Sequence, residues 1–166
     1  MNQQMRRIIL TVATTVFLSA CASVSNAPTS TPPEHSLLRQ IDEAERKWQE
    51  QEIESYRIEV LAVRGTWHAQ SHQITVRSGK AVEASATCNP APAELGKCEV
   101  EPFNAEDYTV PALFALARIR AQRGQGQRTR ITFDPSYGFP NLIASDSPEI
   151  TDGGEVWRVM AFEALE

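Results

Sequence analysis

The order of hydrophobic periods along the chain constrains its fold more than any other feature. A helical period over residues 35–53 precedes three strand-like segments, and a second helical period from residue 109 precedes about three more. Strands joined by short connections pair antiparallel, since a parallel crossover needs roughly a dozen or more residues. Two amphipathic helices can cover one apolar side of such a sheet. We expect an α+β fold with one antiparallel sheet of about five or six strands and two helices packed on one face.

Both helices are indicated by apolar residues at helical spacing. The second helix takes Thr109 as its N-cap, has Pro111 in its first turn and ends at Gly124. In the first helix the apolar residues recur at spacings of four, three and four: Leu37, Ile41, Ala44 and Trp48.

The strands are indicated by alternation of apolar and polar residues, which turns one face inward. Tyr56, Ile58 and Val60 alternate with charged residues in the first strand, and Ser78-Gly79 is a hairpin turn between the second and third. The strands are expected at residues 56–60, 72–76, 81–86, 128–133, 142–144 and 156–162.

The first 20 residues have the three-part plan of an export signal peptide: Arg6 and Arg7, an apolar run, and small residues before Cys21. The cleavage region, Leu18-Ser19-Ala20-Cys21, resembles the lipobox of bacterial lipoproteins. The resemblance implies that Cys21 becomes the mature N-terminus and carries diacylglycerol and a further acyl chain such as palmitate, which anchors the protein to a membrane. The lack of Asp after Cys21 resembles lipoproteins of the outer membrane that face the periplasm. An ordinary secretory signal with a coincidental cysteine is the alternative.

The mature chain is expected to begin with a tether and continue as one acidic domain. Residues 21–33 comprise the lipidated end and a disordered stretch rich in Ser, Thr, Pro and Ala, and residues 34–166 form a single globular domain. Loss of Arg6 and Arg7 reduces the 16 Lys and Arg to 14 against 21 Asp and Glu, a net charge of −7. This balance and the envelope location argue against nucleic acid as a partner.

Three cysteines are present, and lipidation of Cys21 leaves Cys88 and Cys98 as a pair. In an oxidising periplasm we expect these two to form a disulfide, which stabilises by roughly 2.5–3 kcal/mol for so short a loop. Nine intervening residues are too many for a redox Cys-x-x-Cys pair, and no histidine lies nearby to complete a zinc site.

Residues 133–140 read Phe-Asp-Pro-Ser-Tyr-Gly-Phe-Pro, the most idiosyncratic segment of the mature chain. Together with Trp48 and the Ile53-x-x-Tyr56 entry to the first strand, it resembles an uncharacterised bacterial envelope family, domain of unknown function 6174. In that family a Trp-bearing helix precedes a Ser-Tyr strand start, and a later strand ends in a Tyr-Asp-Pro-x-x-Gly-Tyr-Pro turn. The resemblance covers about residues 45–162 and implies no activity.

Two departures from the family pattern are visible. Phe133 and Phe139 stand where tyrosine is usual. The family often carries a Cys-x-Cys pair just after the first strand, whereas residues 63–67 here read Val-Arg-Gly-Thr-Trp, so any role of that pair does not carry over.

The segment from residue 133 to residue 146 supports two interpretations. As a tight connection, Asp134 bonds local backbone amides, Gly138 supplies a positive φ and Pro140 stiffens the return strand. As the rim of a ligand groove, it offers aromatic faces suited to a sugar or peptide, and the rim consists of Asp134, Tyr137, Gly138, Phe139, Pro140 and Asp146.

Five arginines lie within thirteen residues: Arg118, Arg120, Arg123, Arg128 and Arg130. They could form an anion site for lipid headgroups, lipopolysaccharide phosphate or an acidic protein surface, since arginine binds phosphate bidentately. Alternatively, the first three complement the helix dipole and the last two face solvent from the next strand.

The sequence nominates neither a metal site nor a catalytic base. His68 and His72 have a helical metal-ligand spacing, but the local pattern indicates a loop entering a strand. Asp134, Asp146 and Asp152 lack the alternating oxygen pattern of a calcium loop, and no Gly-x-Ser-x-Gly elbow occurs. We expect no metal, no cofactor and no enzymatic activity, although convergence of Asp134 and Asp146 in a cleft would favour an enzyme.

The sequence therefore favours a lipid-anchored, non-enzymatic module of the bacterial envelope that binds an envelope protein. The binding surface would be an exposed sheet face or the turn at Tyr137. The alternative is a carrier or sensor of a small envelope ligand, a lipid or glycan, held in a pocket between the helices and the sheet.

Overall fold

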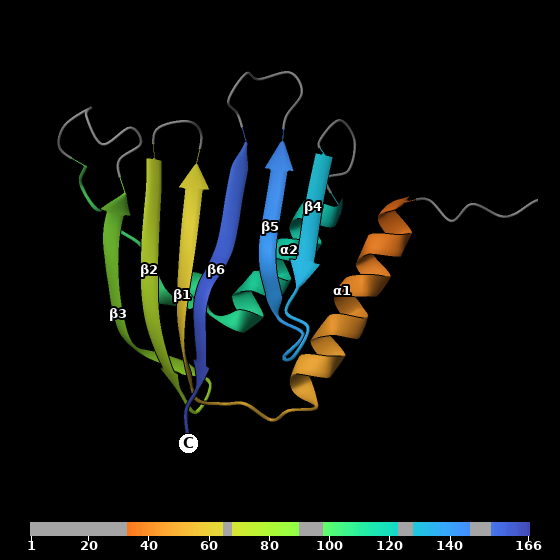
Figure 1. Ribbon diagram of the computed structural model, residues 1–166, viewed down its shortest axis with the longest axis horizontal. Helices are drawn as coiled ribbons and strands as arrows, with labels where there is room; N and C mark the ends of the chain where they lie inside the picture. Colours follow the sequence, from red (N-terminus) through yellow and green to blue (C-terminus); the bar gives the residue numbers. More distant parts are fainter. Residues whose placement is uncertain (1–32, 65–67, 90–97, 123–127, 147–153) are drawn as a thin grey trace, which may run out of the picture. The chain divides into compact units, whose positions relative to one another are not determined.

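Six strands form one antiparallel sheet in the order β3-β2-β1-β6-β5-β4 (Figure 1). The computed structural model describes residues 33–64, 68–89, 98–122, 128–146 and 154–166. Along the chain the elements are α1 (Pro33–Gln49), β1 (Tyr56–Arg64), β2 (His68–Arg77), β3 (Lys80–Asn89), the short 3-10 helix η2 (Ala105–Tyr108), α2 (Val110–Gln122), β4 (Arg128–Phe133), β5 (Pro140–Asp146) and β6 (Glu155–Ala164).

The expected α+β fold is confirmed, but most strands are longer than the alternating apolar residues indicate. β2 begins at His68 rather than near His72, because it pairs with β1 along its whole length, from Tyr56 opposite Val76 to Arg64 opposite His68. Backbone pairing with a neighbour, which the sequence pattern does not record, therefore sets the strand ends.

The first helix ends earlier than the expected residue 53. α1 stops at Gln49, and tightened hydrogen bonds follow, from the Gln51 N–H to the Trp48 carbonyl and from the Glu52 N–H to the Gln49 carbonyl. Glu52 has a φ of 52°, a left-handed conformation that breaks the helix and that is unusual outside glycine. The apolar stripe alone could not reveal this end.

Both helices lie on the same face of the sheet, and the core lies between them and the sheet. Tyr56, Ile58 and Val60 are buried on this face, as their alternation indicates. Trp48 of α1 packs edge-on against Tyr56, with ring centroids 5.7 Å apart, and the first backbone N–H of α2 donates to the same tyrosine. Both helices therefore contact the same residue of the sheet, Tyr56.

Tyr56 takes over the capping of α2 that Thr109 was expected to provide. Thr109 does precede the helix, but its hydroxyl donates to the Glu106 carbonyl at 2.9 Å. The Tyr56 hydroxyl instead accepts from the Val110 N–H at 3.0 Å, and burial raises the pKa of this phenol to about 12. A buried helix end without such a partner would be costly.

The β2–β3 hairpin and the disulfide form as expected. Ser78 and Gly79 both have positive φ, 48° and 76°, which is the conformation of a tight two-residue hairpin turn. Cys88 near the end of β3 is joined to Cys98 in a disulfide, with Cα atoms 5.7 Å apart. This bond ties β3 to the segment that leads into η2.

Several expectations concern residues outside the described ranges. These are the signal peptide, Cys21 and the tether, together with Arg123, Gly124 and Asp152. Within the described ranges, no helix is long and apolar enough to cross a membrane.

The turn between β4 and β5 docks directly on α1. A Cβ atom added at Gly138 would lie 2.8 Å from the Ala44 backbone oxygen, so only glycine allows this approach. Lys47 donates to the Pro135 carbonyl, and the Gln51 side chain donates to the Tyr137 carbonyl at 2.8 Å. Gly138 also has a φ of 88°. The packing of this turn on the helix therefore depends on one glycine.

Gly138→Ala should destabilise the fold more than Gly79→Ala. Gly79 also has positive φ, but nothing lies within 4 Å of an added Cβ, so alanine there costs about 1–2 kcal/mol of backbone strain. At Gly138 the contact with α1 adds to this strain, for a loss of about 2–5 kcal/mol. Urea unfolding of the purified variants measures both losses, and equal losses would contradict the docking of the turn on α1.

Candidate functional site

Asp134 organises the β4–β5 turn through hydrogen bonds to local amides. Its Oδ1 atom accepts from the backbone N–H of Ser136 at 2.9 Å and of Tyr137 at 2.8 Å. Its own backbone N–H donates to the Phe139 carbonyl at 2.8 Å. These contacts are those of a tight connection, and they fix the main chain that carries Tyr137 and Phe139.

β5 and β6 separate beside this turn. β6 pairs with β1 along Glu155–Ala164, but with β5 only over residues 155–158, opposite residues 142–145. Beyond Arg158, β6 therefore has a sheet neighbour on one side only.

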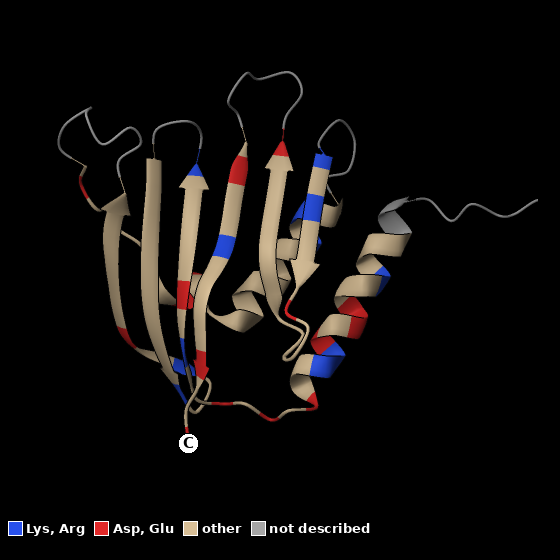
Figure 2. Cartoon of the chain, viewed as in Figure 1, with Lys and Arg blue, Asp and Glu red and all other residues tan. Residues whose placement is uncertain are grey.

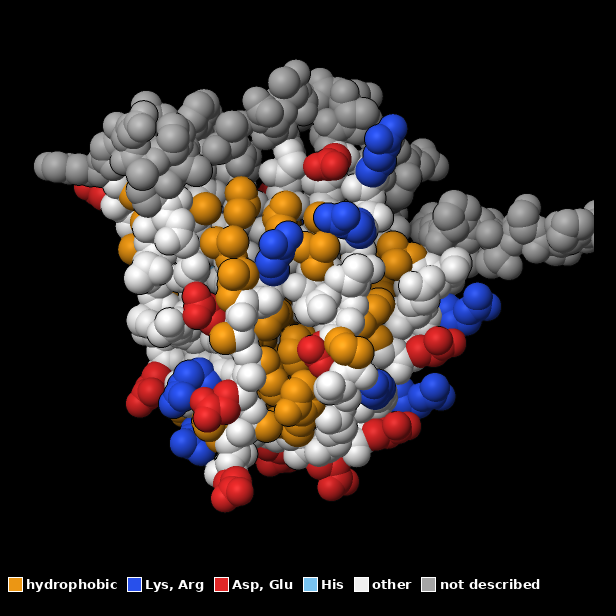
Figure 3. Space-filling view, viewed as in Figure 1, with side chains coloured by type: hydrophobic (Ala, Val, Ile, Leu, Met, Phe, Trp, Pro, Cys, Tyr) orange, Lys and Arg blue, Asp and Glu red, His pale blue; other side chains and the backbone are white. Residues whose placement is uncertain are grey.

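A groove opens between β6 and the turn, where hydrophobic side chains are visible low in the centre of Figure 3. Tyr137 and Phe162 are half-buried at its surface, and Phe139 is buried beneath them. Tyr137 and Phe139 are stacked with centroids 6.0 Å apart, and Phe162 lies 4.9 Å from Tyr137 and 4.7 Å from Phe139. We call this cavity of about 230 Å3 the Tyr137 groove, and it is lined by Asp134, Tyr137, Phe139, Asn141, Val159, Met160, Ala161 and Phe162.

The main chain of β6 contributes polar groups to the groove. The Leu165 N–H donates to the Ser55 carbonyl, so the main chain at residue 165 faces β1. Main-chain groups alternate sides along a strand. The N–H and C=O groups of Phe162, which lines the groove, and of Ala164, just beyond its lining, therefore face the side on which β5 no longer pairs.

The six expected rim residues do not all meet at the groove. Asp134, Tyr137 and Phe139 line it, whereas Gly138 is buried against α1 and Pro140 is buried at the start of β5. Asp146 lies at the other end of β5, about 20 Å away at ~3.4 Å per residue. Asp134 and Asp146 therefore do not converge in a cleft.

The described arginines do not form one anion patch. Arg118 bonds Asp42 and Glu45 of α1 at 2.7 and 2.6 Å, and these carboxylates raise its pKa. Arg120 bonds Glu155, and its guanidinium lies over the Trp157 ring, 5.1 Å from the centroid. The other two described arginines are exposed on β4, whose charged residues are all basic (Figure 2).

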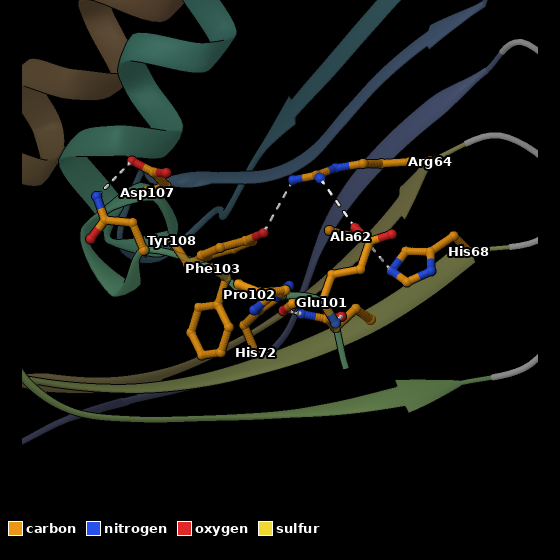
Figure 4. Close-up of a pocket in the computed structure, with 11 residues that line it drawn as sticks. Ala62, Arg64, His68, His72, Glu101, Pro102, Phe103, Asp107 and Tyr108 are labelled. Carbon is orange, nitrogen blue, oxygen red and sulfur yellow. Dashed lines mark hydrogen bonds and ion pairs between the residues drawn. The ribbon is translucent and has the colours of Figure 1, made fainter. Parts of the chain in front are cut away.

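A second cavity, of about 140 Å3, opens where η2 and the segment before it meet the ends of β1 and β2 (Figure 4). We call it the Arg64 pocket. It is lined by Ala62, Arg64, His68, Gln70, His72, Glu101, Pro102, Phe103, Asn104, Asp107 and Tyr108.

The charged groups at the mouth of the Arg64 pocket are close together but loosely paired. Arg64 lies 3.9 Å from a Glu101 carboxylate oxygen and donates to the Tyr108 hydroxyl at 3.4 Å. The same Glu101 oxygen lies 3.6 Å from His68. Gln70 fixes the backbone here, because its amide both donates to and accepts from the main chain of Glu101, at 3.1 and 2.9 Å.

His72 forms the buried side of this pocket. It is 1% exposed, its ring is stacked on Tyr108 with centroids 3.6 Å apart, and Phe103 meets it edge-on at 4.7 Å. Its Nδ1 atom has no hydrogen-bond partner among the described residues. Burial, assisted by the charges of Arg64 and His68, lowers the pKa of His72 to about 4, so its ring is neutral at pH 7.

The sequence pattern does not indicate this pocket. It predicts a loop at His68, whereas His68 and His72 both lie on β2 and both line the cavity. No group of three or more His, Cys, Asp or Glu suited to a metal ion occurs in the described part of the chain. The one available signal was His72 at an inward position of an alternating strand, where an apolar residue is usual.

The burial of His72 predicts a specific loss of stability in acid. The unfolded chain protonates this histidine below its ordinary pKa of about 6.5, but the folded chain does so only near 4. The contribution of His72 to the free energy of unfolding is therefore complete above pH 6.5, and it falls by roughly 3 kcal/mol as the pH drops to 4. Urea unfolding at several pH values should show a steeper acid loss for the wild type than for His72→Phe. Parallel losses would contradict a neutral buried ring.

Comparison with known proteins yields one family. No curated protein matches the chain. The model of a family of unknown function, DUF6174, matches residues 40–164, which run from α1 to the end of β6 and include both cavities. The chain therefore belongs to this family of unknown function.

Proposed function

We propose that this protein is a lipid-anchored, non-enzymatic module of the bacterial envelope that binds an extended segment of another envelope protein in the Tyr137 groove. The observation that supports the proposal best is the aromatic groove left open where β5 and β6 part. Exposed apolar surface beside unpaired strand edges is typical of peptide-recognition sites.

The chemistry of the groove indicates what kind of segment it would accept. The outward main-chain groups of Phe162 and Ala164 can pair with an extended backbone, which gives affinity without reading sequence. The half-buried rings of Tyr137 and Phe162, which pack on the buried Phe139, would accept apolar or aromatic side chains. The carboxylate of Asp134 at the edge favours a segment that also carries Lys or Arg.

The anchor rests on the sequence of the signal region. Cleavage before Cys21 and acylation of this cysteine would hold the domain at a membrane surface, and the eleven residues between Cys21 and α1 could span roughly 35 Å at ~3.1 Å each. An anchored module needs only a modest affinity, because tethering raises the effective concentration of a partner in the same membrane.

Photo-crosslinking in intact cells tests the groove. A photoreactive amino acid at Met160, which is 54% exposed at the groove, should give a discrete protein adduct. The same residue at Val82, which is 55% exposed on β3, is the matched control and should not give this adduct. Tyr137→Ala should remove the adduct at Met160 because it removes part of the aromatic lining. Equal adducts at both positions, or an adduct unaffected by Tyr137→Ala in a folded variant, would contradict the proposal.

Metabolic labelling tests the anchor separately. Cells grown with labelled palmitate should incorporate label into the wild-type protein, whereas Cys21→Ser should remain unlabelled and be released from the membrane fraction. Cys88→Ser is the control, since this thiol is in a disulfide and should not affect labelling. Label that persists in Cys21→Ser would exclude acylation at this residue.

A further inference from the structure

The Arg64 pocket is a second site that the peptide-binding proposal does not use. It lies between η2 and the ends of β1 and β2, whereas the Tyr137 groove lies between β6 and the β4–β5 turn. We propose that the Arg64 pocket binds the carboxylate group of a small organic acid, which replaces the Glu101 side chain on Arg64.

The pocket supplies hydrogen-bond donors to such a group from Arg64 and Tyr108. The Arg64 guanidinium has five N–H donors, and its two neighbours lie at 3.4 and 3.9 Å, longer than a well-formed charge-assisted hydrogen bond. The Tyr108 hydroxyl accepts from Arg64 and donates to no described residue. Burial raises the pKa of this phenol, so the hydroxyl keeps its proton as a donor.

The buried wall of the pocket also lacks a partner. His72 is fully enclosed, yet its Nδ1 has no hydrogen-bond partner in the described ranges. A buried polar atom left unpaired costs free energy, so the wall of the pocket is polar but unsatisfied. The aromatic rings of Tyr108 and Phe103 beside it would pack against a short carbon skeleton.

Glu101 serves as the internal counterion that the ligand would displace. Its side chain is 56% exposed, so it can rotate into solvent without leaving a buried charge behind. The other carboxylate of the pocket, Asp107, accepts from Asn104 at 3.3 Å and lies away from Arg64 in Figure 4. A carboxylate bound at Arg64 would therefore replace one negative charge with another.

The size and charge of the pocket limit the ligand. Its volume of about 140 Å3 is well below the roughly 300–1,000 Å3 of sites for drug-sized molecules. One arginine suits a single carboxylate, and the nearby carboxylates disfavour a more highly charged anion. The same group occurs in a free short-chain acid and at the carboxyl terminus of a peptide, and acetate and N-acetylalanine represent these two sources.

Titration of the purified full chain with sodium acetate, in low-chloride buffer and followed by amide NMR shifts, tests the proposal. We expect saturable shifts around Arg64 and His72, with a dissociation constant on the order of millimolar for so small a ligand. Tighter binding of N-acetylalanine would identify a peptide terminus as the better ligand, and tighter binding of acetate a free acid. Sodium chloride at the same concentrations should not reproduce the shifts.

Three variants separate this site from general anion binding. Arg64→Gln should weaken acetate binding at least tenfold, which is the effect of losing one charge-assisted contact. Glu101→Gln should strengthen binding, because it removes the competing carboxylate. Arg57→Gln is the matched control, since Arg57 also lies on β1, is similarly exposed and also pairs with a glutamate.

Any of three results would overturn the proposal. The first is shifts that chloride reproduces or that never saturate. The second is acetate binding that Arg64→Gln and Arg57→Gln weaken equally. An opposite effect of Glu101→Gln, weaker rather than stronger binding, would show that Glu101 builds the site and is not displaced, and would likewise exclude the exchange.

Discussion

The arrangement of the elements depends on the indole ring of Trp48. It meets Tyr56 of β1, Phe162 of β6 and Phe139 of the β4–β5 turn edge-on, at centroid distances of 5.7, 5.7 and 6.1 Å. Each such contact contributes about 0.5–1.5 kcal/mol beyond the burial of its apolar area. Because the Tyr56 hydroxyl also accepts from the first amide of α2, one aromatic cluster positions both helices against the sheet.

The groove is a consequence of the same cluster. The turn is held to α1 by the contacts of Gly138, by Lys47 and by Gln51. Its aromatic residue Phe139 packs edge-on against Trp48. β5 must therefore leave β6 to reach the helix, while β6 remains paired with β1. By anchoring the turn, α1 separates the ends of β5 and β6 while the core between the helices and the sheet stays intact.

Local patterns predicted the elements and their order, since a strand or helix records its buried face in its own residues. The ends were less predictable: α1 stops where Glu52 adopts a left-handed conformation, and partner strands set the length of β2. The turn at Tyr137 was identified because its glycine, prolines and aromatics are adjacent in sequence. The Arg64 pocket was not, because Arg64, His72 and Tyr108 come from β1, β2 and η2, three separate segments that only the tertiary fold brings together.

β3 is an edge strand with one neighbour and no fully buried residue, the kind of strand that most readily detaches and pairs with another molecule. In this protein β3 is bonded to the η2 region at both of its ends. The Glu106 carboxylate accepts from the Ala81 N–H at 3.1 Å near its start, and the disulfide at Cys88 secures its far end. Exchange of this strand between two copies would require both the hydrogen bond and the disulfide to break at once. The oxidised chain therefore resists domain swapping at an edge that is otherwise poorly protected.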